Sequence, residues 1–254
     1  LTKINREDLK ENLLIGRTHK SLKDINDPTN GKSKSIFSLI RTKNVLLHHP
    51  YDLFATSIEE FINKAADDPL IMAIKITLYR VSKDSPIIEA LIRAAENGKE
   101  VMTLVELKAR FDEDNNIQWA KQLEQAGIHV VYGIIGFKTH TKICLAIRKE
   151  KGRLRNYFHI GTGNYNSITS KFYTDIGFLS TDTEIASDLV ELFNYLSGFA
   201  KQKNYKKLLV SPFSMRRKFI SLIQREILNA TSGKKGEIIA KMNSLVDPEI
   251  IELL

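Results

Sequence analysis

The chain has 254 residues, of which 43% are hydrophobic and 27% charged, the composition of a globular protein with a sizeable core. No run approaches 18 apolar residues, so we expect no membrane span, and no secretory signal is recognisable at the start. Cys144 is the single cysteine, which excludes a disulfide framework and a multi-cysteine zinc or iron–sulfur site. This cysteine usage favours a reducing, cytosolic setting.

The formal net charge of +8 is unevenly distributed. Residues 201–241 contain eleven Lys or Arg and two Glu, a local balance of +9, so the other residues together carry −1. Such an excess favours a polyanion partner. It is equally typical of a solvated helix face whose acidic neighbours lie elsewhere in a larger protein, and both interpretations stay open.

The first regular element is expected after a turn-rich linker at residues 26–34. Residues 70–78 form a short apolar run with one lysine and predict a buried strand. Ser85 and Pro86 then have the form of a helix N-cap followed by proline at the first helical position. The helix that they predict ends at Gly98.

Strand-like and helix-like segments continue to alternate along the chain. Helices are predicted over 115–125 and 184–200, and strands over 101–107, 128–132, 141–147 and 156–160. This alternation predicts an α/β fold with helices packed on the faces of a sheet.

An internal similarity predicts a second unit of the same kind. Residues 74–91 and 240–253 each have the pattern of a strand with one lysine, a turn and a proline-started helix. We therefore expect a strand at 240–245 and a second α/β unit that begins near Leu208. The chain has no initiating Met and stops within what would be a young helix, so we expect a fragment.

Two segments, GFKTHTK at 136–142 and GTGNYN at 161–166, have the residue types needed for phosphate chemistry. A histidine and a lysine two apart on a strand point to the same side, so His140 and Lys142 are expected to face one pocket. The glycine-rich segment offers backbone N–H groups and asparagine amides to phosphate oxygens. A neutral imidazole is a competent nucleophile toward phosphorus, and lysines neutralise the oxygens. A histidine that only satisfies a strand-end carbonyl is the weaker alternative in these surroundings.

His48 and His49 invite a metal-site interpretation that we reject. Adjacent residues on a strand point to opposite faces, and no cysteine or third histidine is obviously paired with them. The segment is expected to form a turn, and His19, His129 and His159 are given similarly structural roles. No GxGxxG that opens a helix and no Walker A motif is present.

Blocks of sequence in order along the whole chain resemble the bacterial, phospholipase-D-like polyphosphate kinase family. They are VLLHHPYDLF (45–54), IKITLYR (74–80), LVELKARFDE (104–113), FKTHTK (137–142), IGTGNYN (160–166), YTDIGF (173–178) and AKMNSLVDPEII (240–251). The resemblance implies a phospholipase-D-like sheet flanked by helices. It also implies reversible transfer of the terminal phosphoryl group of ATP to inorganic polyphosphate through a phosphohistidine, with Mg²⁺ as the cofactor.

The resemblance also implies roles for individual residues. His140 matches the histidine that becomes phosphorylated. Arg80 and Arg110 match two arginines at the magnesium–phosphate part of the site, where arginine acts as a bidentate phosphate clamp because it cannot ligate a metal ion. Tyr173 matches a tyrosine that contacts the nucleotide. Possible phosphate or polyphosphate contacts are Lys108, Lys138, Lys142 and Asn164.

Each of these roles has a structural alternative. Arg80 could be an exposed residue after a strand, although ligands of α/β proteins gather at the strand end where it lies. Arg110 could pair with a neighbouring carboxylate. Tyr173 could pack in the core beside Phe172 and Phe178.

The domain organisation implied by the resemblance has three parts. Residues 1–26 would be the tail of a preceding helical domain plus linker, 27–207 a first phospholipase-D-like catalytic domain, and 208–254 the truncated start of a second. Further residues that complete the site would lie before Leu1 and beyond Leu254, so we expect the fragment to be weak or inactive alone. The intact protein is expected to be a homo-oligomer in the cytoplasm, either free or peripheral to the inner membrane, and nucleic acid is not an expected partner.

Two other functions are weighed against the kinase. Hydrolases of the phospholipase D superfamily have an aspartate where this chain has Ile147, which argues against a phosphodiesterase or nuclease. A non-catalytic polyanion-binding module would instead depend on the basic segment 201–241.

Overall fold

The computed structural model describes residues 8, 14–25, 35–81, 85–106, 113–134, 136–199 and 204–254. The chain divides into two compact units, Leu1–Lys201 and Gln202–Leu254, which are described separately. Among the described residues, no helix is both long and apolar enough to cross a membrane.

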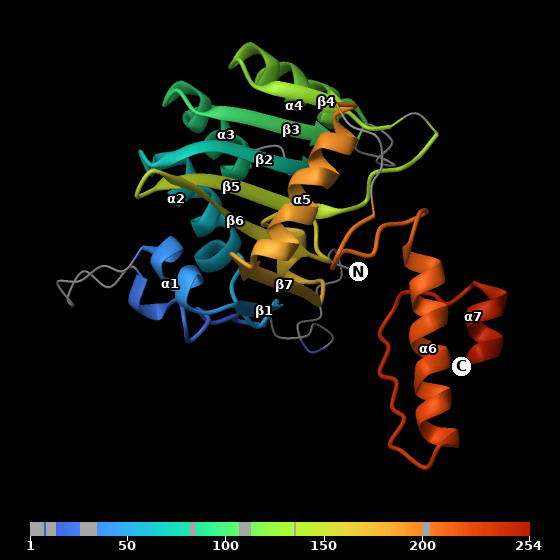
Figure 1. Cartoon of the computed structure of the whole chain (residues 1–254). Helices are drawn as coiled ribbons and strands as arrows, with labels where there is room; N and C mark the ends of the chain where they lie inside the picture. The colour runs from blue at the N-terminus through green and yellow to red at the C-terminus, as the bar shows by residue number, and fades with distance from the viewer. Residues whose placement is uncertain are drawn as a thin grey trace. The chain divides into compact units, whose positions relative to one another are not determined.

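The first unit contains five α-helices and seven strands within its described residues (Figure 1). The helices are α1 (Ile36–Thr42), α2 (Glu60–Asp67), α3 (Pro86–Glu96), α4 (Glu113–Gln125) and α5 (Thr183–Leu196). The strands are β1 (Val45–His49), β2 (Ile71–Leu78), β3 (Glu100–Val105), β4 (His129–Tyr132), β5 (Lys142–Glu150), β6 (Arg153–Gly161) and β7 (Asp175–Ser180). Short 3₁₀ turns at Lys23–Ile25 and Thr169–Lys171 and a π-helical turn at Ala55–Glu59 complete it.

The strands form one mixed sheet in the order β1-β7-β6-β5-β2-β3-β4. β2, β3 and β4 are parallel, and α3 and α4 connect them. β5 runs antiparallel to β2, and β6, β7 and β1 continue the sheet in antiparallel pairs. The expected α/β class, with a sheet flanked by helices, is confirmed.

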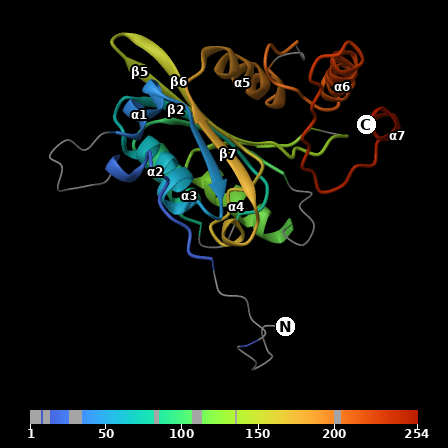
Figure 2. The same cartoon turned by 90° about the horizontal axis from the view of Figure 1, so that it is seen from below.

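Helices cover both faces of the sheet. α1, α2, α3 and α4 lie on one face and α5 on the other, as the view from below shows (Figure 2). The main core lies under the first group, where the apolar stripe of α3 packs with Trp119 and Leu123 of α4. The predicted ends of these helices are confirmed, since Gly98 and Gly127 follow them with φ of +76° and +79°.

The turn predicted after His48 and His49 is also confirmed. Asp52 accepts a hydrogen bond from the His48 N–H at 2.8 Å, and its backbone carbonyl lies 2.7 Å from Nδ1 of His49. His49 is buried and His48 exposed, as alternation along β1 requires.

The second unit contains α6 (Met215–Thr231) and α7 (Pro248–Leu253). The proline-started helix predicted near its end is present, but the strand predicted at 240–245 is wrong, because this segment is exposed and irregular. A strand needs a neighbouring strand for its hydrogen bonds, and the described residues 204–254 contain none.

Part of the basic charge in this second unit is neutralised within the unit. Arg216 of α6 forms ion pairs with Asp247 at 2.6 Å and with Glu249 at 2.6 Å. The acidic neighbours of this arginine therefore lie in the same chain, which favours a solvated helix surface at this position. Arg217 and Lys218 are exposed.

Candidate active site

Several strand ends gather at one edge of the sheet, which we call the carboxyl edge. The parallel strands β2, β3 and β4 end there at Leu78, Val105 and Tyr132. β5 begins there at Lys142, which pairs with Gly161 at the end of β6. Ligands of open α/β sheets bind outside the carboxyl ends of parallel strands, so the topology itself favours a site here.

Three cations and a histidine surround the ring of Tyr79, the first residue after β2. The guanidinium carbon of Arg80 lies 5.4 Å from the ring centroid, and the Nζ atoms of Lys138 and Lys142 each lie 5.2 Å from it. The ring of His140 meets the Tyr79 ring edge to face, with centroids 5.1 Å apart. We call these five residues the Tyr79 cluster. It brings together four residues that the sequence had singled out.

Side chains from β2 and from the end of β3 hold the backbone on either side of His140. The buried carboxylate of Glu106 accepts a hydrogen bond from the Thr139 N–H at 2.7 Å. The hydroxyl of Thr77 on β2 donates to the carbonyl oxygen of Thr141 at 2.7 Å. The imidazole is therefore presented from a fixed loop, and a fixed position is what a nucleophile needs.

The prediction that His140 and Lys142 project from one strand is wrong. β5 begins at Lys142, and His140 lies in the preceding loop, where side chains of Glu106 and Thr77 take the backbone groups that a strand partner would bind. Lys142 is buried and its Nζ donates to the carbonyl oxygen of His140 at 2.6 Å. The two side chains still meet, but at the ring of Tyr79.

The surroundings favour the neutral form of His140. The residue is exposed overall, but partial burial of its ring, and then the positive charges of Lys142, Lys138 and Arg80, lower the pKa of His140 below 6.5. Burial also lowers the pKa of Lys142 to about 8, with Arg80 and Lys138 contributing and Asp175 opposing. An imidazole with a free lone pair therefore stands among cations that an arriving phosphate would stabilise.

The loop of residues 161–166 is tied to the same edge. The amide of Asn166 donates to the carbonyl oxygen of Arg80 at 3.4 Å and accepts from the N–H groups of Ile168 and Thr169. This amide is therefore used to fold the loop. By contrast, the buried Oδ1 of Asn164 has no hydrogen-bond partner within the described part of the chain.

Two glycines at this edge make room for His159, which lies fully buried in β6. A Cβ atom at Gly161 would lie 2.8 Å from Cε1 of His159, and one at Gly177 would lie 2.9 Å from its Nε2. Nδ1 of His159 is 2.8 Å from the hydroxyl of Tyr165 in the loop. Burial, and then the charge of His49, lower the pKa of His159 to about 3, so it is neutral.

The remaining predicted residues are Arg110, Lys108 and Tyr173. Arg110 and Lys108 lie outside the described residues. Tyr173 follows the 3₁₀ turn and is 64% exposed, and its neighbour Phe172 is 65% exposed. The alternative that Tyr173 packs in the core is therefore wrong, and its ring is accessible to a ligand.

The sequence had not singled out Tyr79, Glu106 or Thr77. Tyr79 and Glu106 directly follow two adjacent parallel strands, a position where polar and aromatic residues of α/β proteins commonly meet ligands. Tyr79 and Glu106 could therefore have been predicted as site residues from their place after these strands. Thr77 had no such signal, because only the pairing of β2 with β5 brings it to the loop.

Comparisons with known proteins agree on one family. Residues 35–202 match the family model described as polyphosphate kinase C-terminal domain 1, and residues 208–254 match that of C-terminal domain 2. A polyphosphate kinase of Parasynechococcus marenigrum is 65% identical over 241 residues, which are 95% of this chain and 34% of that protein. One of Mycobacterium avium is 49% identical over 251 residues, 99% of this chain and 34% of that protein.

A solved structure gives the same result. The crystal structure of polyphosphate kinase from Porphyromonas gingivalis matches with a TM-score of 0.78 and 36% identity, over 88% of this chain and 37% of that one. The chain thus spans about a third of the length of the curated relatives that it matches. On this sequence and structural evidence, the chain belongs to the polyphosphate kinase family.

Proposed function

We propose that the Tyr79 cluster is the phosphoryl-transfer site of a polyphosphate kinase, and that His140 carries the phosphoryl group between ATP and inorganic polyphosphate. One observation supports this above all. A neutral imidazole is fixed against Tyr79 among three cations that reach the same ring. Nucleophile and charge stabilisation are thus present in one place.

The reaction has two balanced steps. A ring nitrogen of His140 uses its lone pair to form an N–P bond with the γ-phosphorus, while the bond from that phosphorus to the bridging oxygen breaks and ADP leaves. A terminal phosphate oxygen of the polymer then attacks the same phosphorus, and the N–P bond breaks. Arg80, Lys138 and Lys142 hold the phosphate oxygens, whose charge must be neutralised as each attacking atom approaches.

Magnesium is the proposed cofactor. The described residues contain no group of three His, Cys, Asp or Glu that could hold a metal ion. Mg²⁺ commonly takes most of its ligands from substrate phosphates and water, so the site needs few protein oxygens. The partnerless Oδ1 of Asn164 would hold the ion, which would neutralise phosphate charge when bound. We place Tyr173 and Arg110 at the nucleotide and phosphate parts of the site.

Two alternatives are less well supported. A phospholipase-D-class phosphodiesterase would need an aspartate that this chain lacks. Ile147 occupies that position, in the middle of the sheet, where it pairs with Ala73 and Asn156. A non-catalytic polyanion-binding module would not require a neutral histidine among the cations.

The test is phosphoryl labelling of the full-length protein with γ-labelled ATP and Mg²⁺. The matched variants are His140→Ala and His129→Ala, the second removing an exposed histidine of β4. We expect acid-labile, base-stable label in the wild type and in His129→Ala, and none in His140→Ala. Unchanged labelling in His140→Ala would refute the phosphohistidine. The 254-residue chain alone is expected to transfer weakly, and processive synthesis by it would refute that expectation.

A further inference from the structure

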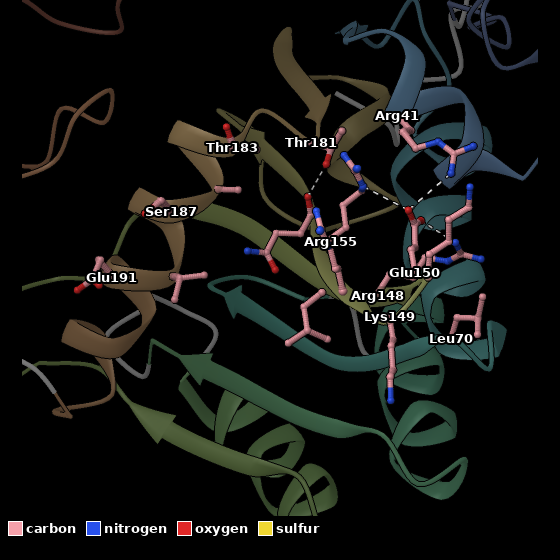
Figure 3. Close-up of a pocket in the computed structure, with 16 residues that line it drawn as sticks. Arg41, Leu70, Arg148, Lys149, Glu150, Arg155, Thr181, Thr183, Ser187 and Glu191 are labelled. Atoms are coloured by element: carbon pink, nitrogen blue, oxygen red, sulfur yellow. Dashed lines mark hydrogen bonds and ion pairs between the residues drawn. The ribbon is translucent and has the colours of Figure 1, made fainter.

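A groove lies at the opposite end of the sheet, between the β5–β6 hairpin and α5. It has a volume of about 1030 Å³ and sixteen lining residues, all of them described (Figure 3). Lys142 of the Tyr79 cluster and Glu150 of the groove are the first and last residues of β5, about 27 Å apart along the strand at about 3.4 Å per residue, and no residue belongs to both sites. The two sites are therefore separate.

The groove is strongly cationic and contains no aromatic side chain. Two of the sixteen residues are acidic, and six are basic, namely Arg41, Arg148, Lys149, Lys151, Arg153 and Arg155. Single-stranded nucleic acids are commonly held by aromatic side chains that stack on bases. A lining of cations and hydroxyls without aromatic rings better fits a phosphate chain that has no bases.

One of the two carboxylates is already surrounded by donors. Glu150 accepts a hydrogen bond from Arg148 at 2.7 Å and pairs with Arg155 at 3.2 Å and Arg41 at 3.6 Å (Figure 3). It also accepts a hydrogen bond from the Tyr157 hydroxyl at 2.6 Å. Burial opposes ionisation, but these hydrogen bonds and charges lower the pKa of Glu150 overall. The carboxylate orients the arginines and leaves the groove with excess positive charge.

The remaining three cations of the groove, all within the described residues, form no ion pair with Glu150. Lys149, Lys151 and Arg153 are exposed, and no ion pair involves them within the described part of the chain. Lys151 has a φ of +47° in the hairpin turn. The turn fixes its backbone and presents the three cations along a short stretch of chain.

We propose that this groove is an accessory site for a segment of inorganic polyphosphate distant from the phosphoryl-transfer site. The identity of the polymer rests on the proposed function. A polymer bound at the groove would raise the effective concentration of its own ends near the enzyme, so that long chains would be retained between transfers.

The test measures binding of long-chain polyphosphate to the full-length protein carrying His140→Ala, without ATP. The groove variant combines Lys149→Gln, Lys151→Asn and Arg153→Gln, with Asn at 151 because it tolerates positive φ. The control combines Lys20→Gln, Lys23→Gln and Lys121→Gln, which removes the same charge from exposed positions outside the groove.

We expect the groove variant to bind about tenfold more weakly and the slope of log affinity against log salt to fall by about 2, with less than a twofold loss in the control. No loss, or an equal loss in both variants, would overturn the proposal. If the triple variant is unstable, Lys149→Gln alone replaces it, and we expect this single variant to lose about twofold in polyphosphate affinity. Because no transfer is measured, failure of the phosphohistidine proposal would leave this result unaffected.

Discussion

The two ends of β5 gather cations in different ways. At the carboxyl edge, Arg80, Lys138 and Lys142 surround the neutral ring of Tyr79. At the groove, three arginines surround the carboxylate of Glu150. Around the ring of Tyr79 the cations repel one another, and Arg80 and Lys138 add to the burial that lowers the pKa of Lys142, whereas the carboxylate of Glu150 helps to raise the pKa of Arg148. The first arrangement is prepared for an incoming anion, and the second already contains one.

The largest expected effect comes from removing the buried cation at the carboxyl edge. Lys142→Met should lower the rate of His140 phosphorylation by about 100-fold, because a group that stabilises transition-state charge is lost. Lys149→Met, near the other end of the same strand, should change that rate less than twofold. Quenched-flow labelling of both variants measures the difference, and equal effects would contradict the distinction between the two ends.

The backbone clamp on the His140 loop should have the next largest effect. Glu106→Ala leaves the Thr139 N–H without its acceptor and should reduce the free energy of unfolding by about 2 kcal/mol. It should also slow His140 phosphorylation at saturating ATP. Glu106→Gln keeps an acceptor oxygen and should therefore retain most of the wild-type stability and most of the wild-type phosphorylation rate. Urea titration would measure the first and labelling the second. If Glu106→Gln loses as much stability and phosphorylation rate as Glu106→Ala, the hydrogen bond to the Thr139 N–H does not explain the losses.

Removing the carboxylate charge at the groove should affect stability and leave the chemistry unchanged. Glu150→Gln should lower the free energy of unfolding by about 1–2 kcal/mol, because charged hydrogen bonds to Arg148 and Tyr157 are weakened. Glu100→Gln, at an exposed position of β3, is the control and should be neutral. A slower phosphorylation rate in Glu150→Gln would show that the two ends are coupled.

The smallest expected effect is on pH dependence. Since Lys138 helps to lower the pKa of His140, Lys138→Gln should raise that pKa toward 6.5. Protonation abolishes the nucleophile, so labelling should begin to fall at a higher pH in the variant than in the wild type. Lys149→Gln should leave the titration unchanged, and NMR of the His140 ring protons would measure all three proteins. An unchanged or lowered pKa in Lys138→Gln would contradict the electrostatic account.

Much of the fold could be predicted because its signals are local. The apolar run before Ser85, the proline after it and Gly98 marked β2 and α3 within a few residues. The strand predicted at 240–245 failed for a reason that local pattern cannot detect. A strand depends on a neighbouring strand for its hydrogen bonds. Residues 240–245 have a strand-like pattern but form no strand, because the described residues 204–254 contain no strand with which they could pair.

The candidate site divides in the same way. His140, Lys138, Lys142 and Arg80 could be recognised from the sequence, because motif and residue type are local properties. Their meeting at Tyr79, the support of the loop by Glu106 and Thr77, and the six cations that line the groove follow from the folded arrangement of distant segments. The contacts of Tyr79 with His140 and of Thr77 with Thr141 join residues more than sixty positions apart. The pairing of β2 with β5 brings these residues together, and no single segment encodes it.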